Sequence, residues 1–253
     1  MLQSFFLKDI VFAMEFLDYK RLEAIEAKRF QQTDPYPWIN PAGLLTDAGY
    51  ERLLGHMPST DQMTPTFGMQ RSHGQKAHDR YALEYRDDVD LDPAWHEFIA
   101  ELRGKRYHDF IKRMFGRGLF KLNFHWHYAP RGASVSPHCD AQRKLGSHIF
   151  YFSSPENWDV SWGGDTVILD DHGKFDRKSA PEFEDFPDAY QGESMGNYSL
   201  LFQRQAKSWH GVREITCPEG MHRKVFIVVI NDRVRAAVRR IKGRLKGEEI
   251  RDV

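Results

Sequence analysis

The stretch Asn123-Phe-His-Trp-His-Tyr-Ala-Pro-Arg-Gly-Ala-Ser-Val-Ser-Pro-His-Cys-Asp140 carries the strongest structural signal in the chain. His138 and Asp140 are two residues apart at the edge of a β-like run, so strand alternation places both side chains on one face. An imidazole and a carboxylate then point at a common position. A histidine from a distant strand would complete a 2-His-1-carboxylate triad, which leaves positions open on Fe(II). We select His210, in the segment Ser208-Trp-His-Gly-Val212, as that third ligand.

The beginning of the same stretch offers a rival metal-binding pair. Apolar and polar residues alternate from Phe120 to Tyr128, so a strand places His125 and His127 together on one face. No Asp or Glu lies on the same face of this strand beside the pair. We therefore interpret the two histidines as part of the polar face of a sheet. For Tyr128 we predict a hydrogen bond from the hydroxyl to a ligand carboxylate inside the fold, with local bonding in a packed core as the alternative.

Further motifs follow in a fixed order across residues 120 to 232. A Tyr and a Gly precede Pro-His-any-Asp, and an aromatic strand, a Gly-Gly-acidic turn, a Ser-any-His-any-Val unit and an Arg before an apolar strand come after it. The residues in these places are Tyr128, Gly132, Pro137, His138, Asp140, Tyr151, Trp158, Gly163, Gly164, Asp165, Gly196, Ser208, His210, Val212 and Arg223. This succession resembles the 2-oxoglutarate/Fe(II)-dependent dioxygenases, in particular their prolyl-hydroxylase-like branch.

The resemblance implies a mostly β fold with flanking helices, built on a double-stranded β-helix, which is a jelly-roll core of the cupin type. We expect residues 1–119 to form a helical lead-in and support, 120–232 the catalytic core, and 233–253 a basic amphipathic helix. A chain of 253 residues can bury a sizeable core, and we expect these parts to form one structural domain. Within the lead-in, apolar spacing predicts a helix from Met14 to Gln32.

Two other segments lack periodicity. Residues 57–80 are polar, and we expect a loop in which His73 and His78 are solvated. Residues 170–193 are acidic and long for a connection in a compact barrel, which is typical of a lid over substrate or of a solvated surface loop.

The same resemblance implies Fe(II) as the metal held by His138, Asp140 and His210. It implies 2-oxoglutarate and O2 as co-substrates, with ascorbate as a candidate reductant. The guanidinium of Arg223 would offer a planar fork to the distal carboxylate of the keto acid, and Tyr128 a second contact.

One spacing departs from the family pattern. In relatives the arginine follows the distal histidine by about ten residues, whereas Arg223 follows His210 by thirteen, so Arg213 and Arg204 are lesser candidates for the same role. For the primary substrate we name Arg213, Trp209 and Tyr151 as candidate contacts.

The function implied is hydroxylation of an unactivated C–H bond, in an amino-acid side chain that is free or part of a peptide. Asp140 favours hydroxylation over halogenation, since related halogenases lack the carboxylate. The alternatives are a tailoring oxygenase for small molecules and a non-catalytic jelly-roll protein that binds metal. A zinc hydrolase with the same ligands would leave Arg223 without a role and lacks an evident general base.

Composition limits the partners and the compartment. Lysine and arginine balance aspartate and glutamate, so no global field attracts nucleic acid, and no apolar run is long enough to span a bilayer. Two cysteines form no disulfide framework and favour the cytoplasm. The opening residues do not resemble a secretory signal, and Met14 is an alternative start.

Overall fold

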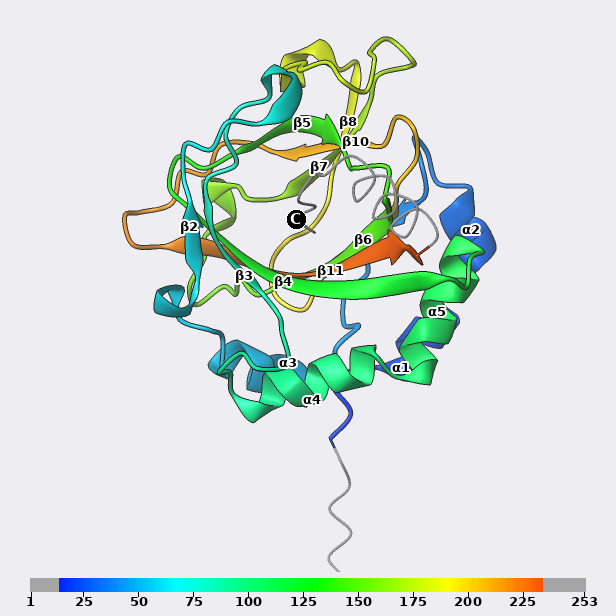
Figure 1. Ribbon diagram of the computed structural model, residues 1–253, viewed down its shortest axis with the longest axis vertical. Helices are drawn as coiled ribbons and strands as arrows, with labels where there is room; N and C mark the ends of the chain where they lie inside the picture. The colour runs from blue at the N-terminus through cyan, green and yellow to red at the C-terminus, as the bar shows by residue number, and fades with distance from the viewer. Residues whose placement is uncertain (1–13, 234–253) are drawn as a thin grey trace, which may run out of the picture.

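The computed structural model describes residues 14–233, in which two antiparallel sheets face each other (Figure 1). The strands are β1 (Trp38–Ile39), β2 (Thr64–Thr66), β3 (Arg80–Glu84), β4 (Phe120–Pro130), β5 (Val135–Cys139), β6 (Lys144–Tyr151), β7 (Thr166–Asp170), β8 (Asp188–Gln191), β9 (Ser199–Gln203), β10 (Trp209–Val212) and β11 (His222–Asp232). The α-helices are α1 (Tyr19–Ala24), α2 (Ala27–Gln31), α3 (Asp47–Gly55), α4 (Pro93–Leu102) and α5 (Lys105–Phe115). Short 3-10 turns are η1 (Thr60–Gln62), η2 (Ser72–Gly74), η3 (Val160–Trp162) and η4 (Phe183–Asp185).

The large sheet has the order β1-β9-β6-β11-β4-β3-β2, and the small sheet has the order β5-β10-β7-β8. The helices lie against the outer side of the large sheet, and the small sheet covers its inner side (Figure 1). Strands β1 to β3 come from the lead-in, so the residues before 119 supply sheet edges as well as helices. The space between the sheets is a cavity of about 1690 Å³.

The long strand β4 shows how the sequence pattern divides the interior. Phe124, Trp126 and Tyr128 are buried in the apolar core that the large sheet shares with the helices. His125 and His127, on the opposite face, line the cavity. The apolar face of this strand therefore points outward to the helices, and its polar face points into the barrel.

The predicted helix from Met14 to Gln32 is wrong, because the chain breaks into α1 and α2. Ile25 and Glu26 have extended backbone angles between the two helices. The guanidinium of Arg113 on α5 donates to the carbonyl of Leu22, at 2.8 Å, and to that of Ile25. These bonds satisfy carbonyl groups that would otherwise lack partners at the end of a helix.

The other helices follow the sequence signals closely. Asp92 caps α4 by accepting from the Ala94 amide at 2.8 Å, and Pro93 occupies the first turn. Gly116, in the left-handed conformation at φ +63°, ends α5. Apart from its first residue, the expected basic helix at 233–253 lies outside the described residues. No helix between residues 14 and 233 combines the length and apolar character needed to cross a bilayer.

A buried histidine in the outer core predicts acid sensitivity. The Nδ1 of His148 lies 2.9 Å from the Tyr107 hydroxyl, and burial lowers the pKa of His148 to about 3. An unfolded histidine titrates near pH 6.5, so between that value and pH 3 the unfolded chain binds the extra proton and stability falls as pH falls. We expect a loss of about 2 kcal/mol between pH 6.5 and pH 5 from this group.

Urea unfolding of His148→Leu across the same range is the measurement. The variant is expected to be less stable at neutral pH, yet to lose less stability on acidification. If the free energy of unfolding falls equally steeply with pH in both proteins, His148 is not the group responsible.

Candidate active site

His138 and His210 are direct cross-strand partners. They pair in register between β5 and β10, and their ring centroids are 4.4 Å apart. Asp140 follows β5 two residues after His138 and shares its face. One ligand atom from each of the three side chains lies within 4.8 Å of the other two, and Asp140 and His210 are buried. The structure thus brings together the three side chains that the sequence nominated.

Backbone carbonyls fix the orientation of both imidazoles. Nδ1 of His138 lies 3.0 Å from the Ser136 carbonyl, and Nδ1 of His210 lies 3.0 Å from the Ser208 carbonyl. Because a carbonyl oxygen only accepts, each Nδ1 carries the proton and each Nε2 keeps its lone pair. Metal-binding histidines are commonly held in this way, with the second ring nitrogen bonded to a backbone or carboxylate oxygen.

The protonation states also match those of metal ligands. Burial lowers the pKa of both His138 and His210, so both imidazoles are neutral. Burial alone would raise the pKa of Asp140, but the Lys144 ammonium and its hydrogen bond outweigh this effect and hold the pKa below its usual range. Lys144 Nζ lies 2.7 Å from Asp140 Oδ1. Two neutral imidazoles and an ionised carboxylate are the forms that bind a divalent cation.

Arg223 lies at the start of β11 and forms the second part of the site. Its side chain is buried and lines the cavity. Its hydrogen bonds go to neutral oxygens, from Nε to the Gly164 carbonyl and from Nη2 to Thr166 Oγ1 at 3.3 Å. The hydroxyl of Tyr151 also donates to Thr166 Oγ1 at 3.0 Å. A buried guanidinium with neutral partners is a site for an anion.

Gly164 is the position where a small change would disturb Arg223 most directly. A Cβ there would lie 3.0 Å from Cδ of Arg223, and the backbone has φ +100°, which favours glycine. We expect Gly164→Ala to shift the guanidinium and weaken its binding of a carboxylate ligand about tenfold or more, at a stability cost of about 1–3 kcal/mol. Isothermal titration calorimetry of the variant and the wild type measures the change.

Gly196→Ala is the matched control. Gly196 has φ +62°, and no atom lies within 4 Å of the position that an added methyl group would take, so this variant carries backbone strain without the contact to Arg223. Equal losses of affinity in the two variants would show that strain alone, not Arg223, is responsible.

Two of the predicted contacts face away from the cavity. Tyr128 points out of the barrel, and its hydroxyl donates to the Pro58 carbonyl at 2.9 Å, so local bonding in a packed core is the correct alternative. Trp209 lies in a separate apolar cluster, because it precedes His210 on the same strand and alternation turns it to the other face.

The three remaining candidates have different surroundings, and one of them contacts Arg223. Arg213 is half exposed and pairs with Glu184 at 3.0 Å. Arg204 donates from Nε to the backbone carbonyl of Asp140 at 3.3 Å, so it contacts the chain just after β5. Of the aromatic candidates, Tyr151 is the one beside Arg223, with the guanidinium 5.5 Å from its ring centroid.

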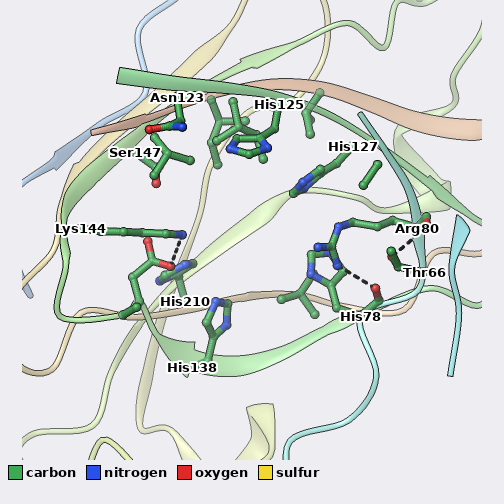
Figure 2. A pocket seen from close by; sticks show the side chains of 18 of the residues that line it. Thr66, His78, Arg80, Asn123, His125, His127, His138, Lys144, Ser147 and His210 are labelled. Carbon is green, nitrogen blue, oxygen red and sulfur yellow. Dashed lines mark hydrogen bonds and ion pairs between the residues drawn. The ribbon is translucent and has the colours of Figure 1, made fainter. Parts of the chain in front are cut away.

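The sequence did not indicate several residues of the cavity wall. His78 is not a solvated loop residue, since it lines the cavity and its ring centroid lies 5.9 Å from that of His127 (Figure 2). Lys144 reaches the triad from the opposite side of this view. The sequence did offer a signal for one further wall residue, Thr166. Its neighbour Val167 on β7 packs in a separate apolar cluster, so strand alternation turns Thr166 toward the cavity.

Another cluster of candidate ligands is separate from the cavity. Asp170, His172 and Asp188 lie on β7, the turn after it, and β8, where His172 and Asp188 are exposed and already hydrogen-bonded to each other at 2.7 Å. The residues that fit Fe(II) are those of the buried triad, where both Nε2 atoms and the Asp140 carboxylate converge.

Comparison with solved structures identifies the fold. A prolyl-4-hydroxylase from Pseudomonas putida matches with a TM-score of 0.57 and 15% identity, over 82% of this chain and 98% of that one. A prolyl hydroxylase from Trichoplax adhaerens, solved with a peptide fragment of hypoxia inducible factor, matches with a TM-score of 0.60 and 12% identity, over 87% and 93%. SnoK, an alpha-ketoglutarate-dependent carbocyclase from nogalamycin biosynthesis, matches with a TM-score of 0.56 and 10% identity, over 83% and 85%.

No protein-family model and no curated protein sequence matches the chain. The structural matches confirm the predicted fold class, which is mostly β with flanking helices and a jelly-roll core. The chain has the prolyl-hydroxylase-like fold of the 2-oxoglutarate/Fe(II) oxygenases.

Proposed function

We propose, starting from this oxygenase fold, that the protein is a 2-oxoglutarate- and Fe(II)-dependent dioxygenase that hydroxylates an unactivated C–H bond. The observation that carries the proposal is that one cavity contains both the triad His138, Asp140 and His210 and the buried cation Arg223. A zinc hydrolase or a simple metal-binding protein would need the triad but would give Arg223 no role.

Each group has a defined task in this reaction. His138, Asp140 and His210 would hold Fe(II), which together with 2-oxoglutarate and O2 supplies the oxidising power. Arg223 would bind the distal carboxylate of the keto acid, with Thr166 and Tyr151 fixing the guanidinium. The two sheets around the cavity would hold the primary substrate close to the metal. Ascorbate is the reductant we propose for restoring Fe(II).

For the substrate we propose an amino-acid side chain, free or in a peptide, because two of the matched structures are prolyl hydroxylases. The second candidate is a tailoring reaction on a small molecule, which the match to the carbocyclase favours. Both cysteines, Cys139 and Cys217, are free thiols, and we propose a reducing, cytoplasmic setting.

The test needs no knowledge of the primary substrate. Titrating 2-oxoglutarate into the Fe(II) protein without oxygen is expected to produce a saturable visible charge-transfer band. Absence of the band in folded protein that has bound iron would overturn the proposal and favour a metal-binding or zinc-dependent role.

A further inference from the structure

The cavity has a charge that the rest of the chain does not share. The whole sequence has a formal net charge of zero, yet nine lysines and arginines line the cavity against two acidic residues, Glu84 and Asp140. Asp140 belongs to the triad and is paired with Lys144, and Glu84 accepts from Asn123. The cavity is therefore strongly positive beyond what the metal ligands require.

Three of these cations have buried nitrogen atoms without partners. Arg71 Nη1, Arg80 Nε and Arg177 Nε are shielded from solvent and have no hydrogen-bond partner among the described residues. They come from three segments: the connection between β2 and β3, the strand β3, and the loop after β7. Buried guanidinium atoms without acceptors cost free energy, so a protein keeps them where a ligand supplies the acceptors.

Arg71 and Arg80 enter the cavity from segments of the chain other than the one that carries Arg223. Arg223 extends from the start of β11 to Gly164 and Thr166, whereas Arg80 reaches into the cavity from β3, at the opposite edge of β4 (Figure 2). Arg80 is held in place by its Nη1, which donates to the His78 carbonyl at 3.0 Å. Arg71 is close enough to the triad for its charge to act on Asp140 and His138.

The size of the cavity supports a second ligand beside the keto acid. Its volume of about 1690 Å³ exceeds the roughly 300–1,000 Å³ of typical small-molecule sites. We infer that Arg71 and Arg80 form an oxyanion subsite, and that the primary substrate carries a carboxylate or phosphate group bound there. This inference rests on the proposed function and narrows its substrate to an anionic class.

Sulfate is the probe for the subsite. It is titrated, at constant ionic strength with chloride, into protein loaded with Fe(II) and saturating 2-oxoglutarate under anaerobic conditions, and binding is followed by calorimetry. We expect saturable binding in the wild type and at least tenfold weaker binding in Arg71→Gln and Arg80→Gln. Arg86→Gln is the matched control, because Arg86 lines the same cavity but is exposed and paired with Asp88.

Two further measurements distinguish an anion subsite from a cofactor site and from a purely structural role of these arginines. Loss of the charge-transfer band as sulfate binds would assign Arg71 and Arg80 to 2-oxoglutarate and overturn the inference. Without anion, Arg71→Gln is expected to melt at the same temperature as the wild type or higher, because it removes an unsatisfied buried charge. A melting temperature lower by several degrees would show a structural role instead.

Failure of the proposed function remains distinguishable from failure of the subsite. If the wild type gives no charge-transfer band, the sulfate titration is repeated on metal-free protein, where arginine-dependent binding would still show the subsite. Absence of saturable sulfate binding in both forms would overturn it.

A substrate panel tests the class directly. Matched carboxylic acids and their methyl esters are compared for stimulation of succinate formation, and we expect stimulation by acids alone. Active esters beside inactive acids would contradict an anionic substrate.

Discussion

His210→Ala is expected to weaken Fe(II) binding by more than about 100-fold and to abolish the 2-oxoglutarate charge-transfer band. The reason is geometric, because His210 is the cross-strand partner of His138 and would supply the third ligand atom. Its Nδ1 bond to the Ser208 carbonyl leaves Nε2 as the only nitrogen of this ring available to bind metal. The measurement is iron stoichiometry after desalting, followed by the anaerobic titration.

Two histidine variants serve as controls. His56→Ala removes an exposed imidazole whose Nδ1 bonds to the Arg52 carbonyl, and it should bind iron normally. His127→Ala tests the rival pair on β4, which lines the same cavity without a carboxylate in step. Retention of iron by His210→Ala with loss in His127→Ala would move the metal site to β4.

The triad could be predicted because its spacing is local and its motifs occur in order. His138 and Asp140 need only the two-residue period of a strand to share a face, and the succession of later motifs places His210 on a partner strand. The fold class followed from the same motifs. The longer gap before Arg223 corresponds to the turn that precedes β11, which contains Gly220 at φ +79°.

The error at Tyr128 has a specific physical cause. The two faces of β4 can be identified from sequence, but which of them lines the barrel cannot. In many barrels the apolar face fills the interior, whereas here the interior holds charged side chains and the apolar face packs on α4 and α5. Only the position of the helices, which is a long-range property, settles the choice.

The positively charged residues of the cavity wall were not predicted from the sequence, for a related reason. Residues 57–80 have no periodicity because β2 has three residues and the connection to β3 is long. His78, Arg71 and Arg80 become cavity residues only when this hairpin pairs with the edge of β4. Pairing of that kind depends on register with a distant strand, and the composition of the loop carries no sign of it.

Arg223→Leu is expected to raise the dissociation constant of 2-oxoglutarate by about 100-fold while leaving Fe(II) binding unchanged. A carboxylate held by a guanidinium loses two charge-assisted hydrogen bonds in this variant, and a combined loss of about 3 kcal/mol corresponds to that factor. Arg223→Lys keeps the charge but not the planar fork, so an intermediate value is expected. The dissociation constant of each of the three proteins is measured from the midpoint of the charge-transfer titration.

Arg213→Leu is the matched control, since Arg213 is the lesser candidate for the same role. Its guanidinium pairs with Glu184 and lies 4.6 Å from the Phe183 ring centroid, outside the cavity, so its removal should leave the midpoint unchanged. A larger effect from Arg213→Leu than from Arg223→Leu would place the keto acid under the 170–193 segment. Equal and small effects would mean that the distal carboxylate is bound by other cations of the cavity, such as Arg71 and Arg80.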